Sequence, residues 1–424
     1  MIYPLNHCSS KHRWFLEAKQ SKKSKYREFF IWSKDTTLYK ESGILFSGLS
    51  KSNWTKADKQ DDEYYFHRFF DFQPDLNYKN PKVLIEMTNI IIYWLNKGID
   101  GFRLDAIPFI WKEEKTDCRN LTQTHLIVKF LRAAANIVNN NVLMLAEACQ
   151  PLEEIVKYLN DNSECNGAYN FPLITSIYKS LATENKIHIE NILIDDVFKK
   201  VDQNAQWFLF LRGHDELSFE KDYVSEKDRE NLVKYYCKDK RWSFRNNEGI
   251  SSRLSELFNF ELKKILLANS LLLTLPCTPI IYYGDELALG NDYSYFDKFK
   301  LGNNRVDDSD DVDNEVIDSR NIIRGSIDWD IINTDLRTKS SLTFQVFNML
   351  KKMIHERNLY KVFGEGKLII VETNLDNVLA YKRVLGDREV LVLNNLSDSV
   401  VHINIKNVVN VMLDSYDFKW LEFL

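Results

Sequence analysis

The chain has 424 residues, of which 44% are hydrophobic and 28% are charged, and its formal net charge is −5 at pH 7. These proportions are typical of a folded globular protein and exclude an intrinsically disordered chain. The weak negative charge argues against a general nucleic-acid-binding protein and fits an enzyme with a small neutral substrate. A chain of this length accommodates one large domain and a second, smaller one.

Cysteine usage and the terminal residues indicate a reduced, cytoplasmic protein without membrane contact. None of the six cysteines forms a Cys-x-x-Cys pair, so their spacing suggests no metal knuckle and reduced thiols are expected. Residues 1–7 contain no basic region followed by a long apolar run, so we expect no signal peptide. The most apolar run, residues 265–283, is interrupted by Pro276 and Pro279, which favours a helix, a turn and a buried strand over a membrane span.

The first part of the chain predicts a strand, a loop-rich insertion and a helix. A strand is expected over residues 2–6, whereas residues 8–77 are rich in aromatic and charged side chains and lack strong helical periodicity. Asn80-Pro81 is typical of a helix start, because asparagine caps the first turn and proline is favoured at the first helical position. Gly98 ends this helix. Its apolar face is formed by Val83, Met87, Ile90, Ile91 and Trp94.

Strands then alternate with helices as far as residue 356. A strand over residues 101–105 precedes a helix near 122–138, and residues 142–147 form an apolar run typical of a parallel strand buried on both faces. The helix has an apolar face formed by Leu126, Phe130 and Ala134. Further strands are expected near residues 168–172, 207–212 and 279–283, and further helices near 151–160, 173–183, 261–275 and 338–356. This alternation predicts a parallel sheet.

The pattern changes after Gly364. Short apolar runs separated by turn residues predict a small antiparallel domain with strands at residues 367–371, 378–382, 390–394 and 400–403. The acidic run at residues 307–315 is expected to be a surface loop. We therefore expect an α/β fold with a larger domain over residues 1–7 and 78–360, an inserted loop-rich subdomain over 8–77 and a C-terminal β domain over 361–424.

The strand at residues 101–105 carries the first candidate site residues. Successive side chains of a strand point to opposite faces, so Arg103 and Asp105 project together, opposite to Phe102 and Leu104. A neighbouring arginine keeps an aspartate ionised at neutral pH. An ionised carboxylate at the end of a strand is what a covalent glycosyl-transfer mechanism needs as its nucleophile, although an ordinary buried ion pair explains the same residues.

Two other predicted strands also end in polar residues, Glu147 in one case and His214-Asp215 in the other. Polar side chains at the carboxyl ends of parallel strands form the active sites of α/β barrels. We therefore expect the polar residues Asp105, Glu147 and His214-Asp215 to converge at one end of the sheet.

Several motifs resemble those of glycoside hydrolase family thirteen, the α-amylase superfamily. Four of its signature regions have counterparts in order, at Leu5-Asn6-His7, residues 101–105, residues 145–148 and residues 211–216. Residues 73–77 match the marker of the α-glucosidase branch. Within that branch the chain is most similar to trehalose synthases, in residues 12–15, 65–70, 117–121 and 212–217.

The resemblance implies a (β/α)8 barrel and a role for each matched residue. Asp105 would be the nucleophile, Glu147 the general acid/base, and Asp215 the carboxylate that binds ring hydroxyls and stabilises the transition state. Arg103 would orient Asp105. The further substrate-binding residues would be His7, Gln73, His214 and Arg320.

The resemblance also implies the substrates, which would be maltose, trehalose or related α-glucosides. The expected activity is interconversion of maltose and trehalose with retention of configuration. A hydrolase of the α-glucosidase or oligo-1,6-glucosidase type is the alternative, and a homo-oligomer is left open.

The family often holds calcium between the barrel and the insertion, and Asn6 and Asp75 match two of its side-chain ligands. Lys112 stands where a further acidic ligand is usual, which disfavours Ca²⁺ unless the neighbouring Glu113 substitutes for it.

The start of the chain departs from the family pattern. Family members carry two further barrel strands before the segment matched by Asn6-His7, so the strands expected here fall short of the eight that close such a barrel. Unpaired strand edges would remain. The sequence therefore predicts an N-terminally incomplete barrel, and an inactive truncated remnant of such an enzyme is a further alternative.

Overall fold

The structure is a computed structural model that describes residues 1–46, 48–58, 62–201, 204–302, 318–405 and 409–423. The predicted loop at residues 307–315 lies outside these ranges. The chain forms two compact units, one of residues 1–169 and 200–206 and the other of residues 170–199 and 207–424.

The first unit is built on a parallel sheet. Its strands lie in the order β1 (Ile2–Pro4), β5 (Gly101–Asp105), β6 (Leu143–Ala146) and β7 (Gly167–Tyr169). Phe102 and Leu104 of β5 are fully buried, whereas Arg103 and Asp105 on its other face are only partly buried. Gly101 is required where β5 passes β6, because a Cβ there would lie 2.6 Å from the carbonyl oxygen of Leu143. The alternation predicted for residues 101–105 is confirmed.

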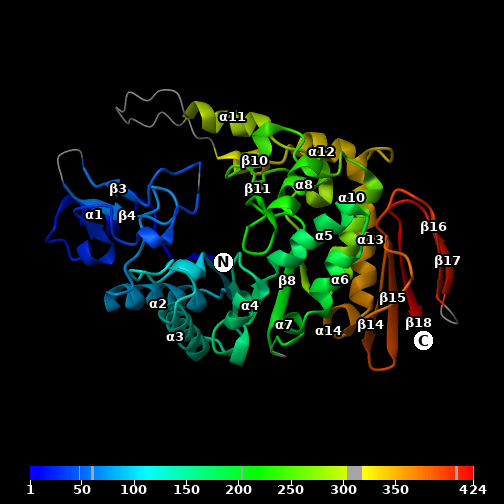
Figure 1. Ribbon diagram of the computed structural model, residues 1–424, viewed down its shortest axis with the longest axis horizontal. Coiled ribbons are helices and arrows are strands. Elements are labelled where there is room, and N and C mark those ends of the chain that lie inside the picture. Colours follow the sequence, from blue (N-terminus) through cyan, green and yellow to red (C-terminus); the bar gives the residue numbers. More distant parts are fainter. Residues whose placement is uncertain (47, 59–61, 202–203, 303–317, 406–408, 424) are drawn as a thin grey trace. The chain divides into compact units, whose positions relative to one another are not determined.

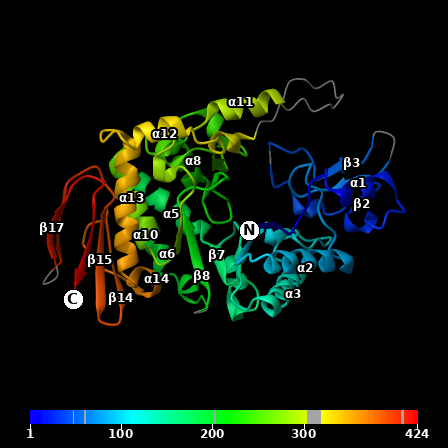
Figure 2. The same cartoon turned by 180° about the vertical axis from the view of Figure 1, so that it is seen from behind.

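Helices α2 (Pro81–Asn96) and α3 (Thr122–Val138) follow β1 and β5 and lie side by side (Figures 1 and 2). Asn80 caps α2, since its side chain accepts a hydrogen bond of 3.1 Å from the backbone N–H of Lys82. The predicted start of this helix and most of its apolar face are confirmed. Its buried side chains are Val83, Met87, Thr88, Ile91 and Leu95.

Helix α3 turns a different face inward from the one that the sequence predicts. Leu126 is 59% exposed and Phe130 is 50% exposed. The buried residues are Thr124, Ile127, Val128, Leu131, Arg132 and Ala135. The helix carries apolar side chains on two neighbouring faces, both with helical spacing, so periodicity alone could not identify the face that packs against the sheet.

The described part of the insertion between β1 and α2 holds one α-helix, two short 3-10 helices and a small antiparallel sheet. The helix α1 (Arg13–Gln20) was not predicted, and it starts where the side chain of His12 accepts a hydrogen bond from the backbone N–H of Trp14. The strands lie in the order β2 (Trp32–Ser33), β4 (Tyr64–Phe66) and β3 (Trp54–Lys56). The buried cluster beside them consists of Ile31, Tyr39, Trp54, Phe66 and Cys118. Because Cys118 comes from the segment after β5, this core is shared with chain outside residues 8–77, and that boundary remains a prediction.

In the second unit β12 (Thr278–Ile280) pairs in parallel with β8 (Gln206–Phe210). The main helices are α5 (Phe171–Thr183), α6 (Ile187–Ile194), α8 (Glu226–Tyr236), α10 (Leu262–Thr274) and α13 (Leu342–Leu359), and α13 lies beside α10 (Figure 2). Every residue of α10 from Ile265 to Thr274 is buried. The strand predicted at 168–172 ends earlier, at Tyr169, because Asn170 caps α5 by accepting a hydrogen bond of 2.9 Å from the backbone N–H of Leu173.

Shorter elements complete this unit. A small antiparallel sheet has the order β10 (Ser243–Phe244), β11 (Gly249–Ile250) and β9 (Leu217–Ser218). The remaining short helices are α7 (Asp196–Lys199), α9 (Leu254–Leu257), α11 (Tyr293–Gly302), α12 (Trp329–Asp335) and α14 (Val362–Glu365), while α4 (Leu152–Ile155) belongs to the first unit. Among the described residues, no helix has both the length and the apolar composition needed to cross a bilayer.

The C-terminal part is an antiparallel sheet, as predicted. Its strands are β13 (Lys367–Ile370), β14 (Val378–Leu385), β15 (Arg388–Asn395) and β18 (Phe418–Phe423), and β16 (Val401–Ile405) pairs with β17 (Val409–Leu413). Gly386, with φ of 59°, lies in the tight turn between β14 and β15, where a positive φ favours glycine. The fold is therefore α/β with a parallel sheet and a C-terminal antiparallel sheet. The N-terminal incompleteness of the barrel remains a prediction.

Candidate active site

The carboxyl ends of β5 and β6 bring Arg103, Asp105 and Glu147 together. Arg103 Nη1 donates a hydrogen bond of 2.6 Å to Asp105 Oδ1, and its Nη2 contacts Glu147 Oε1. The backbone N–H of Ala106 donates to Glu147 Oε2 at 3.1 Å. One guanidinium therefore holds two carboxylates, so Asp105 and Glu147 are close neighbours on the same face of the sheet.

The two carboxylates outweigh the effect of burial on Arg103. Burial lowers the pKa of this guanidinium, but the negative charges of Glu147 and Asp105 raise it, and the net shift is upward. Arg103 therefore remains a permanent cation. The contacts of Glu147 with Arg103 and with the Ala106 N–H favour its ionised form.

His7 and Gln73 form a second pair in the first unit. Gln73 Nε2 lies 2.9 Å from His7 Nε2, and Gln73 Oε1 accepts a hydrogen bond of 3.3 Å from the backbone N–H of Phe70. The amide oxygen is thus engaged, so the amide nitrogen donates to His7 and the imidazole proton lies on Nδ1. Burial lowers the pKa of His7 although Asp75 and Asp105 raise it. His7 is therefore a neutral imidazole at pH 7.

The two predicted calcium ligands, Asn6 and Asp75, lie together and face Lys112. Lys112 Nζ donates a hydrogen bond of 2.6 Å to Asn6 Oδ1 and lies 2.7 Å from Asp75 Oδ2. All three residues are buried, whereas Glu113 is exposed. Two oxygen ligands that already bind an ammonium group do not fit a divalent cation at the same position. Within the described residues, no group of three or more His, Cys, Asp or Glu is arranged to hold a metal ion.

Asp215 lies in the second unit among three cationic or polar partners. Its Oδ1 accepts hydrogen bonds from Arg320 Nη1 at 3.1 Å and Arg324 Nη2 at 3.0 Å, and its Oδ2 lies 3.0 Å from His214 Nε2. Burial raises the pKa of Asp215, but the hydrogen bond with His214 and the charges of Arg320 and Arg324 hold it well below the usual range. Asp215 is therefore ionised, and the structure brings it together with His214 and Arg320.

Arg324 is the functional candidate that the sequence analysis did not select. Its Nε donates a hydrogen bond of 2.8 Å to the backbone carbonyl of His214, in addition to the contact with Asp215. Arg320 is in turn fixed by Asp318, whose two carboxylate oxygens each accept a hydrogen bond of 2.8 Å from its guanidinium. The sequence feature that could have identified Arg324 is its position four residues after another arginine, Arg320.

The predicted catalytic and substrate-binding residues thus form three groups. Asp105, Glu147 and Arg103 form the first, His7 and Gln73 the second, and both belong to the first unit. Asp215, His214 and Arg320 form the third, in the second unit. The expected meeting of Asp215 with the other two carboxylates stays a prediction.

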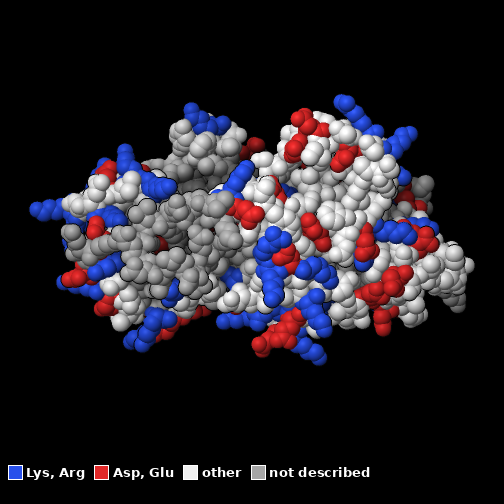
Figure 3. All heavy atoms as spheres, turned by 90° about the horizontal axis from the view of Figure 1, so that it is seen from above, with Lys and Arg blue, Asp and Glu red and all other residues white. Residues whose placement is uncertain are grey.

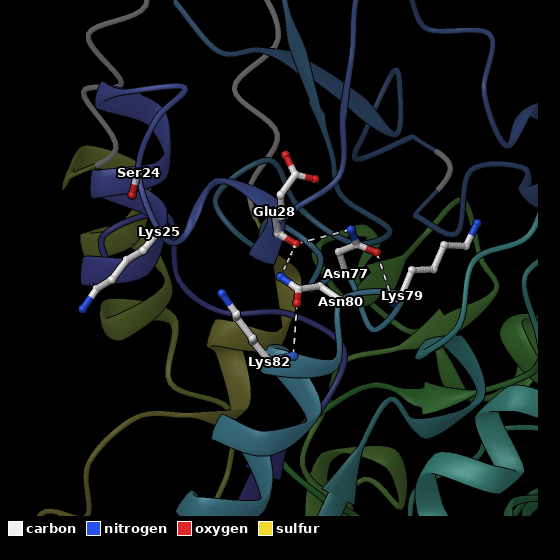
Figure 4. A pocket seen from close by; sticks show the side chains of 7 residues that line it. All are labelled: Ser24, Lys25, Glu28, Asn77, Lys79, Asn80 and Lys82. Carbon is white, nitrogen blue, oxygen red and sulfur yellow. Dashed lines mark hydrogen bonds between the residues drawn. The ribbon is translucent and has the colours of Figure 1, made fainter.

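A polar hollow of about 550 Å³ lies elsewhere in the first unit (Figure 4). It is lined by Ser24, Lys25, Glu28, Asn77, Lys79, Asn80 and Lys82, none of which is a predicted site residue. The amide groups of Asn77 and Asn80 point toward the backbone carbonyl of Glu28 and donate to it at 3.3 and 3.1 Å. These bonds join the insertion to the start of α2. On the described part of the face in Figure 3, basic and acidic side chains are interspersed.

Comparison with known proteins places these residues in a family context. The model of the family described as "Alpha amylase, catalytic domain" matches residues 3–363. The chain is 35% identical over 401 residues to trehalose synthase from Thermus thermophilus, covering 93% of this chain and 41% of that protein. It is 38% identical over 291 residues to trehalose synthase/amylase TreS from Mycolicibacterium smegmatis, covering 68% of this chain and 48% of that protein. The chain therefore spans less than half the length of these two relatives.

Two further comparisons extend this picture. Over 112 residues, or 26% of the chain, it is 46% identical to oligo-1,6-glucosidase from Bacillus cereus, of which this segment covers 19%. The crystal structure of sucrose 6F-phosphate phosphorylase from Thermoanaerobacter thermosaccharolyticum is similar with a TM-score of 0.74 at 18% identity, covering 97% of this chain and 82% of that one. That likeness concerns the fold alone.

Proposed function

Since this chain belongs to glycoside hydrolase family thirteen, the α-amylase family, we propose that it interconverts maltose and trehalose as a retaining glucosyltransferase. The observation that carries the proposal is the contact of one arginine, Arg103, with both Asp105 and Glu147. A double-displacement reaction at a sugar carbon requires two carboxyl groups close to each other. The similarity to trehalose synthases supports the substrate assignment.

In the first step Asp105 attacks the anomeric carbon of maltose while Glu147 donates a proton to the glycosidic oxygen. The glycosidic bond breaks, glucose is released, and a covalent glucosyl ester with Asp105 forms. Because Glu147 contacts Arg103 in the free protein, it must first take up a proton. Its ion pair with Arg103 is then lost, and Arg103 keeps its bond to Asp105.

In the second step the released glucose stays in the site, turns over and attacks the ester through its anomeric hydroxyl. Glu147 takes the proton of that hydroxyl, the ester bond to Asp105 breaks, and trehalose forms with retained configuration. His7, Gln73 and His214 would bind sugar hydroxyls, and Asp215 would stabilise the positive charge that develops on the sugar ring. In a hydrolase, water takes the place of the trapped glucose.

Incubation of the purified chain with maltose tests the proposal. We expect trehalose to accumulate without a stoichiometric amount of glucose, and the Asp105→Asn variant to form neither product. Equal turnover by the two proteins would contradict the assignment of Asp105.

A hydrolase of the α-glucosidase or oligo-1,6-glucosidase type is the second candidate. The segment that is 46% identical to oligo-1,6-glucosidase favours it. The same incubation distinguishes the two, because a hydrolase releases glucose and no trehalose. Absence of any turnover that depends on Asp105 would contradict both candidates.

We also propose a cytoplasmic location, which fractionation of the source cells would test. Limited proteolysis would test the proposed division into three parts, which are residues 1–7 with 78–360, residues 8–77 and residues 361–424. Sedimentation of the purified chain would establish whether it forms a homo-oligomer.

A further inference from the structure

Lys112 is the centre of a buried polar junction in the first unit. Its ammonium group binds Asn6, which follows β1, and Asp75, which ends the insertion, while Lys112 itself follows β5. Asn6 and Asp75 are 0% exposed and Lys112 is 3% exposed. Three segments that are distant in the sequence therefore converge on one positive charge.

The backbone at this junction is also tied together. The N–H of Leu76 donates to the carbonyl of Asn6 at 2.9 Å, and the N–H of Cys8 donates to the carbonyl of Pro74 at 3.2 Å. The remaining carboxylate oxygen of Asp75, Oδ1, accepts a hydrogen bond of 2.9 Å from the N–H of Arg68. This pairing places the side-chain oxygens of Asn6 and Asp75 side by side, where two buried acceptors require a cation or donor between them.

A divalent metal ion can neutralise buried oxygen ligands that come from separate segments. Here the ammonium group of Lys112 supplies the positive charge instead. Its Nζ donates to Asn6 Oδ1 at 2.6 Å, a distance typical of a charge-assisted hydrogen bond, and forms an ion pair of 2.7 Å with Asp75 Oδ2. A second cation beside this ammonium group would meet strong repulsion in a buried setting.

We propose that the ammonium group of Lys112 replaces a bound divalent cation at this junction, so that the chain holds its insertion to the sheet without calcium. Because Lys112 is part of the polypeptide, a chelator cannot remove its ammonium group from the junction. This inference concerns the folded state and does not depend on the proposed activity.

Thermal unfolding of the unmodified chain gives the first test. We expect the same Tm in millimolar EDTA and in millimolar calcium chloride, and no calcium by elemental analysis after dialysis against buffer without metal. A Tm that rises with calcium and falls with EDTA, or one calcium ion bound per chain, would overturn the proposal. This measurement needs no variant and is therefore independent of any folding defect.

Substitutions give the second test. Lys112→Met removes the ammonium partner of a buried carboxylate, so we expect its Tm to fall by roughly 5–10 °C, with no recovery on addition of calcium. Lys82→Met is the matched control, because Lys82 is exposed on α2 of the same unit, and its Tm should stay unchanged. Equal stability of the two variants would overturn the proposal.

Lys112→Glu provides the complementary result. This change removes the ammonium group and adds a carboxylate beside Asn6 and Asp75, which converts the junction into a set of oxygen ligands. We expect the Tm of this variant to depend on calcium, in contrast to the unmodified chain. A folded Lys112→Glu protein that is indifferent to calcium would show that Lys112 does not occupy a cation position.

Discussion

Arg103 and Glu147, from neighbouring strands, are joined by an ion pair, although the sequence indicated only the partnership of Arg103 with Asp105. The same guanidinium therefore fixes the nucleophile and the acid/base candidates relative to each other. A planar group with several donors is suited to this task, since it can present one nitrogen to each carboxylate.

Substitution of Arg103 tests this shared contact. We expect Arg103→Ala to lower kcat by roughly 10²-fold or more, because both carboxylates lose the group that orients them. Arg103→Lys should recover only part of this loss, since a single ammonium group does not reproduce the two-sided contact. Steady-state turnover of maltose measures both, with the exposed Lys97→Ala as control. Parental kcat in Arg103→Ala would contradict this view of the site.

Asp215 should make stability depend on pH in the acidic range. Its pKa in the folded protein is held well below the value of about 3.9 expected for an unfolded chain, so its contribution is fully present above that value and is lost as pH falls. We expect Asp215→Asn to be less stable than the parent at pH 7 and the difference to shrink below about pH 4. Denaturant unfolding at several pH values measures this. A constant difference in stability across that pH range would contradict this prediction. An equal loss of stability in Asp297→Asn, the control variant at an exposed aspartate, would also contradict it.

His7 should remain neutral where an ordinary histidine begins to gain a proton. Burial lowers its pKa from the ordinary value of 6.5, so the titration midpoint of the His7 imidazole should lie below 6.5. NMR titration of the chain, with His7→Gln used for assignment, measures this. A titration midpoint at or above 6.5 would contradict the lowered pKa and weaken the case for the neutral imidazole that accepts the hydrogen bond from Gln73.

Local patterns predicted β5 and the face that carries Arg103 and Asp105. Alternation of buried Phe102 and Leu104 with polar Arg103 and Asp105 is a property of neighbouring residues, so one short stretch of sequence contains it. The contact of Arg103 with Glu147 depends on the pairing of β5 with β6, which places Arg103 opposite Leu145. The register between two strands cannot be predicted from the sequence of either strand alone.

The junction at Lys112 separates what the sequence contained from what it did not. The family resemblance matched Asn6 and Asp75 to two calcium ligands and set Lys112 against calcium. It did not reveal that the ammonium group reaches both oxygens, because the reach of a long side chain depends on the path of the segment after β5. Arg324 was missed for a related reason, since its partner Asp215 is 109 positions away.

The orientation of α3 provides the last prediction, and it follows from the face that the structure buries. Leu131 is 0% exposed and Leu126 is 59% exposed, although both lie in the same helix and are chemically identical. Leu131→Ala should lower the free energy of unfolding by about 2–5 kcal/mol, because it leaves a cavity in the core, whereas Leu126→Ala should change it by about 0.5 kcal/mol or less. Urea unfolding of the two variants measures the difference. If Leu126→Ala lowered the free energy of unfolding more than Leu131→Ala, the buried face of α3 would be the one that the sequence alone predicts. That result would contradict the packing of α3 in the structure.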